Sequence, residues 1–139
     1  MLKLNDAVAY GGADYLVTGK ITYTISGGSF WAFLLQDRDQ KRWLRVGPGN
    51  ELAVCEESTA TVPSPLPDSL SIANQTFSRG DSGTASVVVE GAGGGKRGSV
   101  SYARYASEAN RLWVEDFATE ARVMIGQVID PFEIKTYRK

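Results

Sequence analysis

The chain of 139 residues contains no histidine, and this absence decides most of the catalytic chemistry open to its other residues. Histidine is the commonest general base and the commonest zinc ligand, so Ser-His-Asp and Cys-His mechanisms are excluded. The string Gly80-Asp81-Ser82-Gly83 is similar to the segment around a serine nucleophile, but its serine has no histidine to activate it. We therefore interpret these four residues as a hairpin turn.

The single thiol and the paired carboxylates are weak catalytic candidates. Cys55 is followed by Glu56 and Glu57, and two neighbouring acids should raise the pKa of the thiol, which disfavours nucleophilic catalysis. Glu115 and Asp116 are adjacent. Because neighbours on a strand point to opposite faces, they form no acid–base pair by themselves. An enzyme that uses carboxylates such as Glu115 is therefore the third of three functional interpretations.

A glycine-rich run at residues 91–98 contains the candidate anion contacts. Its glycine spacing matches a dinucleotide-binding fingerprint, but that fingerprint must open a helix, and here the strand-like segment SVSYARY follows. We expect a loop between strands, in which Lys96 and Arg97 are the residues that could contact a phosphate or another anion.

Neither a metal nor a cofactor is expected. With one cysteine and no histidine the chain lacks the ligands of a structural zinc site, so folding should need no metal. Asp37 and Asp39 begin like a calcium-binding loop, but Lys41 takes the third ligand position.

Two tryptophans with charged neighbours are the candidate contacts for a protein partner. On a strand, residues two apart share a face, so Leu44 and Leu112 belong to apolar faces opposite Trp43 and Trp113. If those apolar faces form the core, both indoles point outward beside charges, which is the composition of an interface hot spot. The alternative is a sheet covered on both sides, with buried indoles. The candidate partner-binding residues are Trp43, Arg45, Arg111, Trp113, Glu115 and Phe117.

The segments that must position these residues are strands, because apolar residues recur with a period of two almost everywhere. Residues 15–25 alternate between Tyr, Val or Ile on one face and mainly Thr or Lys on the other. No segment of ten residues has a helical period, and at most one helical turn is expected near 107–110 or 130–132. The pattern predicts an all-β fold of about 9–10 antiparallel strands in a sandwich or barrel-like arrangement. The expected strands span 15–25, 30–35, 42–46, 51–56, 76–79, 84–90, 99–106, 111–117, 121–129 and 133–137.

The chain is expected to be one domain, 1–139, with a faint internal repeat. Residues 30–46 and 100–116 each read as an aromatic strand, a polar turn and a strand containing Arg and Trp. We predict two halves, 1–57 and 69–139, related by an approximate twofold and joined by a Pro-rich loop at 58–68. The alternative is that two hairpins resemble each other by chance.

Composition excludes some partners and suggests a compartment. Lys and Arg number 15 against 16 Asp and Glu, for a net charge of −1, which argues against a nucleic-acid partner. The first six residues lack the apolar stretch of a signal peptide, and no window is apolar enough to span a membrane. One cysteine permits no intrachain disulfide. We therefore expect a cytoplasmic protein.

Short motifs along nearly the whole chain resemble a bacterial family of uncharacterised proteins, the DUF4178 domain. The N-terminal motifs are Asp6-x-Val8-x-Tyr10, Tyr15-x-Val17-x-Gly19, Trp31 with Leu34-Leu35, and Arg42-Trp43-Leu44. The C-terminal motifs are Tyr102-x-x-Tyr105, Leu112-x-Val114-Glu115, and Gly126 within VMIGQVIDPFEI. The resemblance supplies no catalytic residue. It implies an accessory role beside membrane- or stress-associated proteins.

These observations favour a non-catalytic module that binds or assembles with another protein. The second interpretation is a β-barrel that binds a small ligand or an anion, with the loop at 91–98 as its lid. The sequence leaves open whether a second copy of the chain is a partner.

Overall fold

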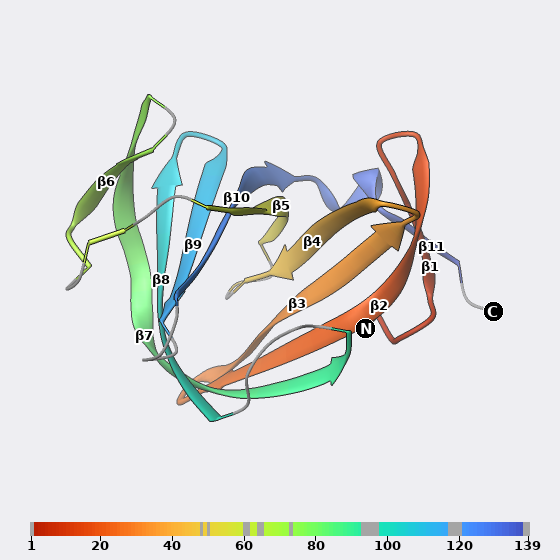
Figure 1. Ribbon diagram of the computed structural model, residues 1–139, viewed down its shortest axis with the longest axis horizontal. Coiled ribbons are helices and arrows are strands. Elements are labelled where there is room, and N and C mark those ends of the chain that lie inside the picture. The colour runs from red at the N-terminus through yellow and green to blue at the C-terminus, as the bar shows by residue number, and fades with distance from the viewer. Residues whose placement is uncertain are drawn as a thin grey trace.

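Strands make up most of the described residues in the computed structural model (Figure 1), as the alternating pattern predicts. The structure describes residues 2–47, 49, 51–59, 62–63, 66–72, 74–92, 98–116 and 121–137. Its strands are β1 (Ala7–Tyr10), β2 (Ala13–Ile25), β3 (Gly28–Asp37), β4 (Gln40–Val46), β5 (Leu52–Ser58), β6 (Ser69–Ile72), β7 (Gln75–Gly91), β8 (Gly98–Ser107), β9 (Asn110–Asp116), β10 (Ala121–Ile129) and β11 (Lys135–Tyr137). A 3-10 helix, η2 (Pro131–Glu133), is the helical turn expected near residues 130–132.

The strands form one antiparallel sheet that closes on itself. The order is β11-β1-β2-β3-β4-β5-β10-β9-β8-β7-β6, and an additional pairing of β2 with β7 closes eight of these strands into a barrel. β1, β11 and β6 lie outside the closure (Figure 1). The prediction of an all-β, barrel-like fold is confirmed. Within the described residues there is no helix long and apolar enough to cross a membrane.

Two expectations about local structure are wrong. Residues 80–83 form no hairpin turn, because β7 runs through them and accommodates them with a register shift between Arg79 and Ser82. The two short strands β1 and β6 were not expected. Both have only four residues, too few for the alternation of apolar and polar side chains to stand out.

Side chains are buried on both faces of the sheet. The faces that point into the barrel form a lumen cluster: Ile21, Tyr23, Phe30, Ala32, Leu34, Trp43, Ala53, Cys55, Ala85, Val87, Val100, Tyr102, Trp113 and Met124. Outside the first half of the barrel lies a first outer cluster of Val8, Tyr15, Val17, Phe33, Leu35, Leu44 and Ile129. Outside the second half lies a second outer cluster of Leu70, Phe77, Ala103, Tyr105, Leu112, Val114 and Val123.

Register shifts move a strand from one cluster to the other. β2 has a shift between Val17 and Gly19, so Val17 packs in the first outer cluster although Ile21 packs in the lumen. The alternation over residues 15–25 therefore does not correspond to one continuous core face. A β-bulge adds one residue to a strand and so exchanges the faces that follow it.

The predicted repeat is present in the strand order. β3 begins at residue 28 and β8 at residue 98, and β4 ends at 46 and β9 at 116, an offset of 70 in both cases. The hairpin registers agree with this offset, since Trp31 pairs with Val46 and Ser101 with Asp116. The turns agree as well, because Arg38 and Glu108 both have positive φ, at 53° and 56°.

The repeat extends beyond the two predicted hairpins. β1 begins at residue 7 and β6 at residue 69, an offset of 62, and Val8 pairs with Tyr15 as Leu70 pairs with Phe77. The repeating unit therefore has five strands, β1–β5 and β6–β10. Equivalent strands pair with each other, β5 with β10 and β2 with β7, both antiparallel, as an approximate twofold requires.

Gly126 lies where β5 and β10 join the two units. A Cβ built on Gly126 would lie 2.6 Å from Cys55 Cα and would also collide with the Val54 carbonyl. We expect Gly126→Ala to lower the free energy of unfolding by about 2–3 kcal/mol, because backbone atoms must move apart. Urea denaturation followed by circular dichroism measures this.

Gly83→Ala is the matched control, because its added Cβ would make an ordinary contact, 3.5 Å from Tyr102 Oη. It should change stability by less than about 0.5 kcal/mol. Equal costs for the two variants would contradict the close approach at Gly126.

Candidate functional site

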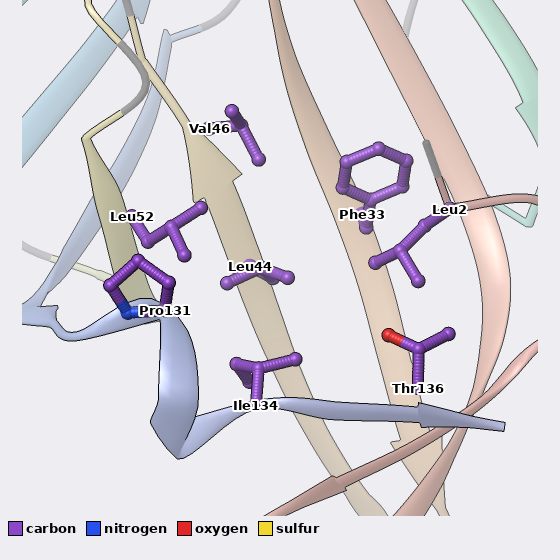
Figure 2. A pocket seen from close by; sticks show the side chains of 8 residues that line it. All are labelled: Leu2, Phe33, Leu44, Val46, Leu52, Pro131, Ile134 and Thr136. Atoms are coloured by element: carbon purple, nitrogen blue, oxygen red, sulfur yellow. The ribbon is translucent and has the colours of Figure 1, made fainter.

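An apolar groove of about 530 Å³ lies on the outer face of the barrel, over β3, β4 and β5 (Figure 2). Leu44 lies on the floor, and Figure 2 shows the C-terminal segment with Ile134 and Thr136 along one side. We call it the outer groove. It is lined by Leu2, Phe33, Leu44, Val46, Leu52, Pro131, Ile134 and Thr136.

Phe132 is 78% exposed, and its neighbours in sequence belong to the outer groove. It lies in η2, between the groove residues Pro131 and Ile134. The turn is held by the Asp130 backbone N–H, which donates to Glu133 Oε2 at 2.7 Å, and by Glu133 N–H, which donates to the Asp130 carbonyl at 3.0 Å. An ordered turn therefore presents an aromatic ring to solvent next to an apolar groove.

A second polar constellation is enclosed within the barrel. Arg45 Nη1 and Glu115 Oε2 are 2.6 Å apart, and both side chains are 1% exposed. Tyr23 donates its hydroxyl to the same carboxylate oxygen at 2.7 Å. The guanidinium lies 4.1 Å from the centroid of the Trp113 ring. Burial raises the pKa of Tyr23, so this hydroxyl keeps its proton and remains a donor.

The predicted partner surface is wrong, because its tryptophans are not exposed. Trp43 is 4% and Trp113 1% exposed, and both belong to the lumen cluster. The buried Arg45 and Glu115 lie on the same two strands, β4 and β9. The reason is that the opposite, apolar faces containing Leu44 are covered from outside, so both faces of each strand are interior. The alternative of a sheet covered on both sides holds.

The other predicted site residues divide into two groups. Arg111 is half-buried and bound by Glu51, so it adds no free charge to a partner surface. Phe117, Lys96 and Arg97 lie outside the described residues.

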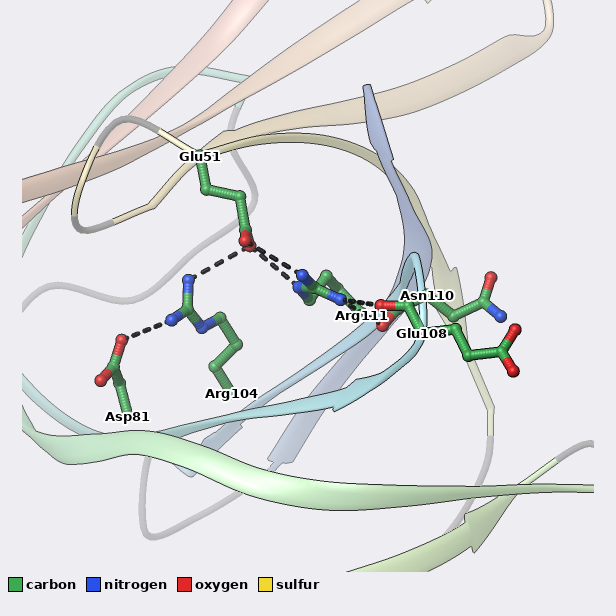
Figure 3. Close-up of polar contacts among 6 residues, drawn as sticks. All are labelled: Glu51, Asp81, Arg104, Glu108, Asn110 and Arg111. Atoms are coloured by element: carbon green, nitrogen blue, oxygen red, sulfur yellow. Dashed lines mark hydrogen bonds and ion pairs between the residues drawn. The ribbon is translucent and has the colours of Figure 1, made fainter. Parts of the chain in front are cut away.

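Charged side chains gather near one end of the lumen (Figure 3). Glu51 accepts hydrogen bonds from Arg104 at 3.1 Å and from Arg111 at 3.0 and 3.2 Å. Arg104 also donates to Asp81 at 2.7 Å and lies 5.9 Å from the Trp113 ring centroid. Because both guanidinium groups already bind carboxylates, this network holds strands together and is a weak candidate for anion binding.

Cys55 is inert for a different reason than the sequence suggests. The prediction of a raised thiol pKa is confirmed, at about 12. Burial of the thiol is the largest cause, and the positive charge of Arg45 acts in the opposite direction. Glu51 contributes in the raising direction. Among the described residues no three His, Cys, Asp or Glu side chains are grouped so that they could hold a metal ion.

The pairing of Arg45 with Glu115 and the exposure of Phe132 both have a signal in the sequence. Arg45 and Glu115 are 70 residues apart, the offset of the repeat, so aligning the halves would have placed opposite charges at one position. Phe132 follows Pro131 just after the last long strand. An isolated aromatic residue in a turn, outside any alternating apolar segment, is a signal for an exposed ring.

Comparison with protein families agrees with the motifs. The family described as "Domain of unknown function (DUF4178)" matches residues 3–131. The chain belongs to the DUF4178 family. No curated protein and no solved structure matches it. The match spans both five-strand units of this DUF4178 domain and ends at Pro131, so β11 lies outside it.

The buried pair in this DUF4178 domain can be tested by a double-mutant cycle. Arg45→Met or Glu115→Leu alone should lower the free energy of unfolding by about 3–5 kcal/mol, because each leaves an uncompensated buried charge. The double variant should cost less than either single variant, since it removes both charges. Urea denaturation of the four proteins measures the coupling, and additive costs would contradict a direct pair.

Stability of this domain should fall in alkali. Burial raises the pKa of the Cys55 thiol in the folded chain to about 12, from its ordinary value of 9.0. Its contribution to stability is therefore complete below pH 9 and is lost as pH rises from 9 to 12, because only the unfolded chain ionises there. Cys55→Ala should make the decline of unfolding free energy shallower by up to about 1.4 kcal/mol per pH unit. Equal slopes in denaturant titrations of both proteins would contradict the buried thiol.

Proposed function

We propose that this domain is a non-catalytic module that binds another protein, and that apolar side chains of the partner occupy the outer groove. The observation that carries the proposal is the groove itself, about 530 Å³ and apolar, with the exposed ring of Phe132 beside it.

The distribution of polarity supports a protein interface. Binding surfaces typically have an apolar, aromatic centre and a polar rim. Phe132 and the groove supply the centre, and Glu133 and Lys135, both exposed, alternate with Phe132 and Ile134 along the same segment. Burying an aromatic ring removes a large apolar area from water, and each Å² of that area contributes a favourable free energy of roughly 25 cal/mol.

The lining of the groove supports a binding role over a catalytic one. The eight lining residues that the structure describes carry no ionisable side chain, and among these eight only Thr136 has a side-chain hydroxyl. Glu115, the carboxylate singled out for enzymatic chemistry, is enclosed in the lumen beside Arg45. A carboxylate-based enzyme therefore remains the third candidate.

A small apolar ligand is the second candidate, because the groove volume lies within the range of about 300–1,000 Å³ typical of ligand sites. The groove differs from the lid-covered barrel interior that the sequence suggested. Aromatic rings stack across that interior, with the centroids of Tyr23 and Phe30 4.6 Å apart. An eight-stranded barrel is narrow enough for side chains to fill its lumen in this way.

The cellular setting is part of the proposal. We propose a cytoplasmic bacterial protein whose partner is membrane- or stress-associated. One cysteine, which permits no intrachain disulfide, supports a reducing compartment. The balanced net charge of −1 gives no support to a nucleic-acid partner.

The test compares three variants of the full chain. Phe132→Ala removes the exposed ring, Val46→Trp fills the groove, and Val88→Ala is the control, since Val88 is 53% exposed on β7 and does not line the groove. A partner captured from host lysate and identified by mass spectrometry is then purified and titrated by calorimetry. Phe132→Ala should weaken binding about tenfold or more, as loss of an interface aromatic does.

Val46→Trp should abolish binding while circular dichroism remains unchanged, and Val88→Ala should bind like the parent chain. Equal affinities for Phe132→Ala and Val88→Ala would refute the groove as the protein-binding site. Native mass spectrometry that finds an apolar small molecule, absent from Val46→Trp, would favour the second candidate instead.

A further inference from the structure

We infer that the outer edge of β6 is a second docking site, which takes an extended peptide segment of a partner protein as an added antiparallel strand. This edge lies at the opposite end of the strand order from β11, which borders the outer groove. The inference therefore goes beyond the proposed function and rests on a different observation, the internal repeat.

β6 and β1 occupy equivalent positions in the two five-strand units. Each has four residues and forms a hairpin with the strand that follows it. The backbone hydrogen bond that precedes each hairpin is also equivalent in the two units. The Asp6 carbonyl accepts from Val17 N–H at 2.9 Å, and the Asp68 carbonyl accepts from Arg79 N–H at 2.8 Å. Both pairs of residues differ by the offset of 62. We therefore expect the outer edge of β6 to bind the same kind of segment as the outer edge of β1.

The edge of β1 shows what fits there. β11 pairs with it antiparallel, with Ala9 opposite Lys135 and Ala7 opposite Tyr137. Ile134, immediately before β11, packs on the first outer cluster. In the part of the chain that the structure describes, β6 pairs with β7 alone and ends the sheet. Figure 1 shows β6 at one side of the molecule and β11 beside β1 at the other.

The backbone of β6 is oriented to accept a strand. Two residues separate β6 from β7, so Ile72 and Gln75, which close the hairpin, exchange backbone hydrogen bonds. Along an antiparallel pair of strands, such hydrogen-bonded residue pairs alternate with pairs that are not hydrogen-bonded to each other. Ser71 and Ser69 therefore direct their N–H and C=O groups away from β7, and their side chains are exposed. They are the counterparts of Ala9 and Ala7, the residues opposite β11.

The chemistry of the occupant follows from β11. It is an extended backbone whose residue opposite Leu70 lies over the second outer cluster, as Thr136 lies opposite Val8 of the first. An apolar residue precedes the strand, in the place of Ile134, and can cover the partly buried Ile72. Main-chain hydrogen bonds supply affinity in this mode, and alternate side chains supply specificity.

A second copy of the chain fits this edge less well. Pairing β6 with the β6 of another copy joins two four-residue strands, and short edge strands are a device by which proteins avoid such association. A free peptide can add the apolar anchor before the strand, which another copy of β6 cannot place in the same way because Pro67 and Asp68 precede it.

The experiment uses the full chain and a fluorescent peptide with the sequence of residues 130–137, DPFEIKTY, as the probe. We expect saturable binding in fluorescence anisotropy. Ser71→Pro removes the outward N–H and should weaken binding at least about tenfold, whereas Ser71→Ala, which keeps it, should bind like the parent chain. Hydrogen exchange at the Ser71 amide should slow when the peptide binds, and this readout needs no variant.

Three results would overturn the inference. The first is no saturable binding with unchanged exchange at Ser71. The second is equal affinity for Ser71→Pro and the parent chain, which would mean that the peptide displaces β11 from β1. The third is a concentration-dependent dimer that Ser71→Pro dissolves, which would assign the edge to a second copy. Phe132→Ala and Val46→Trp should leave peptide affinity unchanged, so failure of the outer groove and failure of the β6 edge are distinguishable.

Discussion

The ion pair between Arg45 and Glu115 is the interaction on which the interior of the barrel depends. Each side chain comes from an equivalent position in one of the two units, and each would be an unpaired buried charge without the other. A barrel closed by two copies of the same unit would bring two like charges together here, at a high electrostatic cost. The pair therefore makes the two units complementary although their strand order is the same.

Burial on both faces follows from that closure. Once the sheet is a barrel, side chains such as Trp43 and Trp113 that point inward must fill a lumen, and those that point outward need cover of their own. Strand β6 lies outside the barrel strands of the second unit, and β1, β11 and η2 lie outside those of the first. The cover over the first unit is incomplete, and the space that it leaves is the outer groove. The outer groove and the β6 edge thus both arise because the two units have the same strand order but different segments packed outside their barrel strands.

The strands were predictable from sequence because the alternation that defines a strand is local. The expected segments 30–35, 42–46 and 121–129 lie within β3, β4 and β10, and the offset between the two Arg-Trp hairpins was already visible. The bulge between Arg79 and Ser82 is a case where local rules mislead, because Gly-Asp-Ser-Gly is a good turn sequence. Pairing of β7 with β8 on both sides of the bulge keeps those residues extended.

The sequence by itself determined the β class, the absence of histidine chemistry and the family motifs, because composition and alternation can be read along one strand at a time. It only suggested the repeat, which the strand order and register then supported. Only the tertiary structure decided which face of each strand is interior. The sequence left open whether Trp43 and Trp113 are exposed or buried, because charged residues share their face. In the structure Arg45 pairs with Glu115, 70 residues away in the sequence, and this face is interior. Whether a charge lies in solvent or beside an opposite charge depends on contacts between distant segments, and the sequence around it carries no record of them.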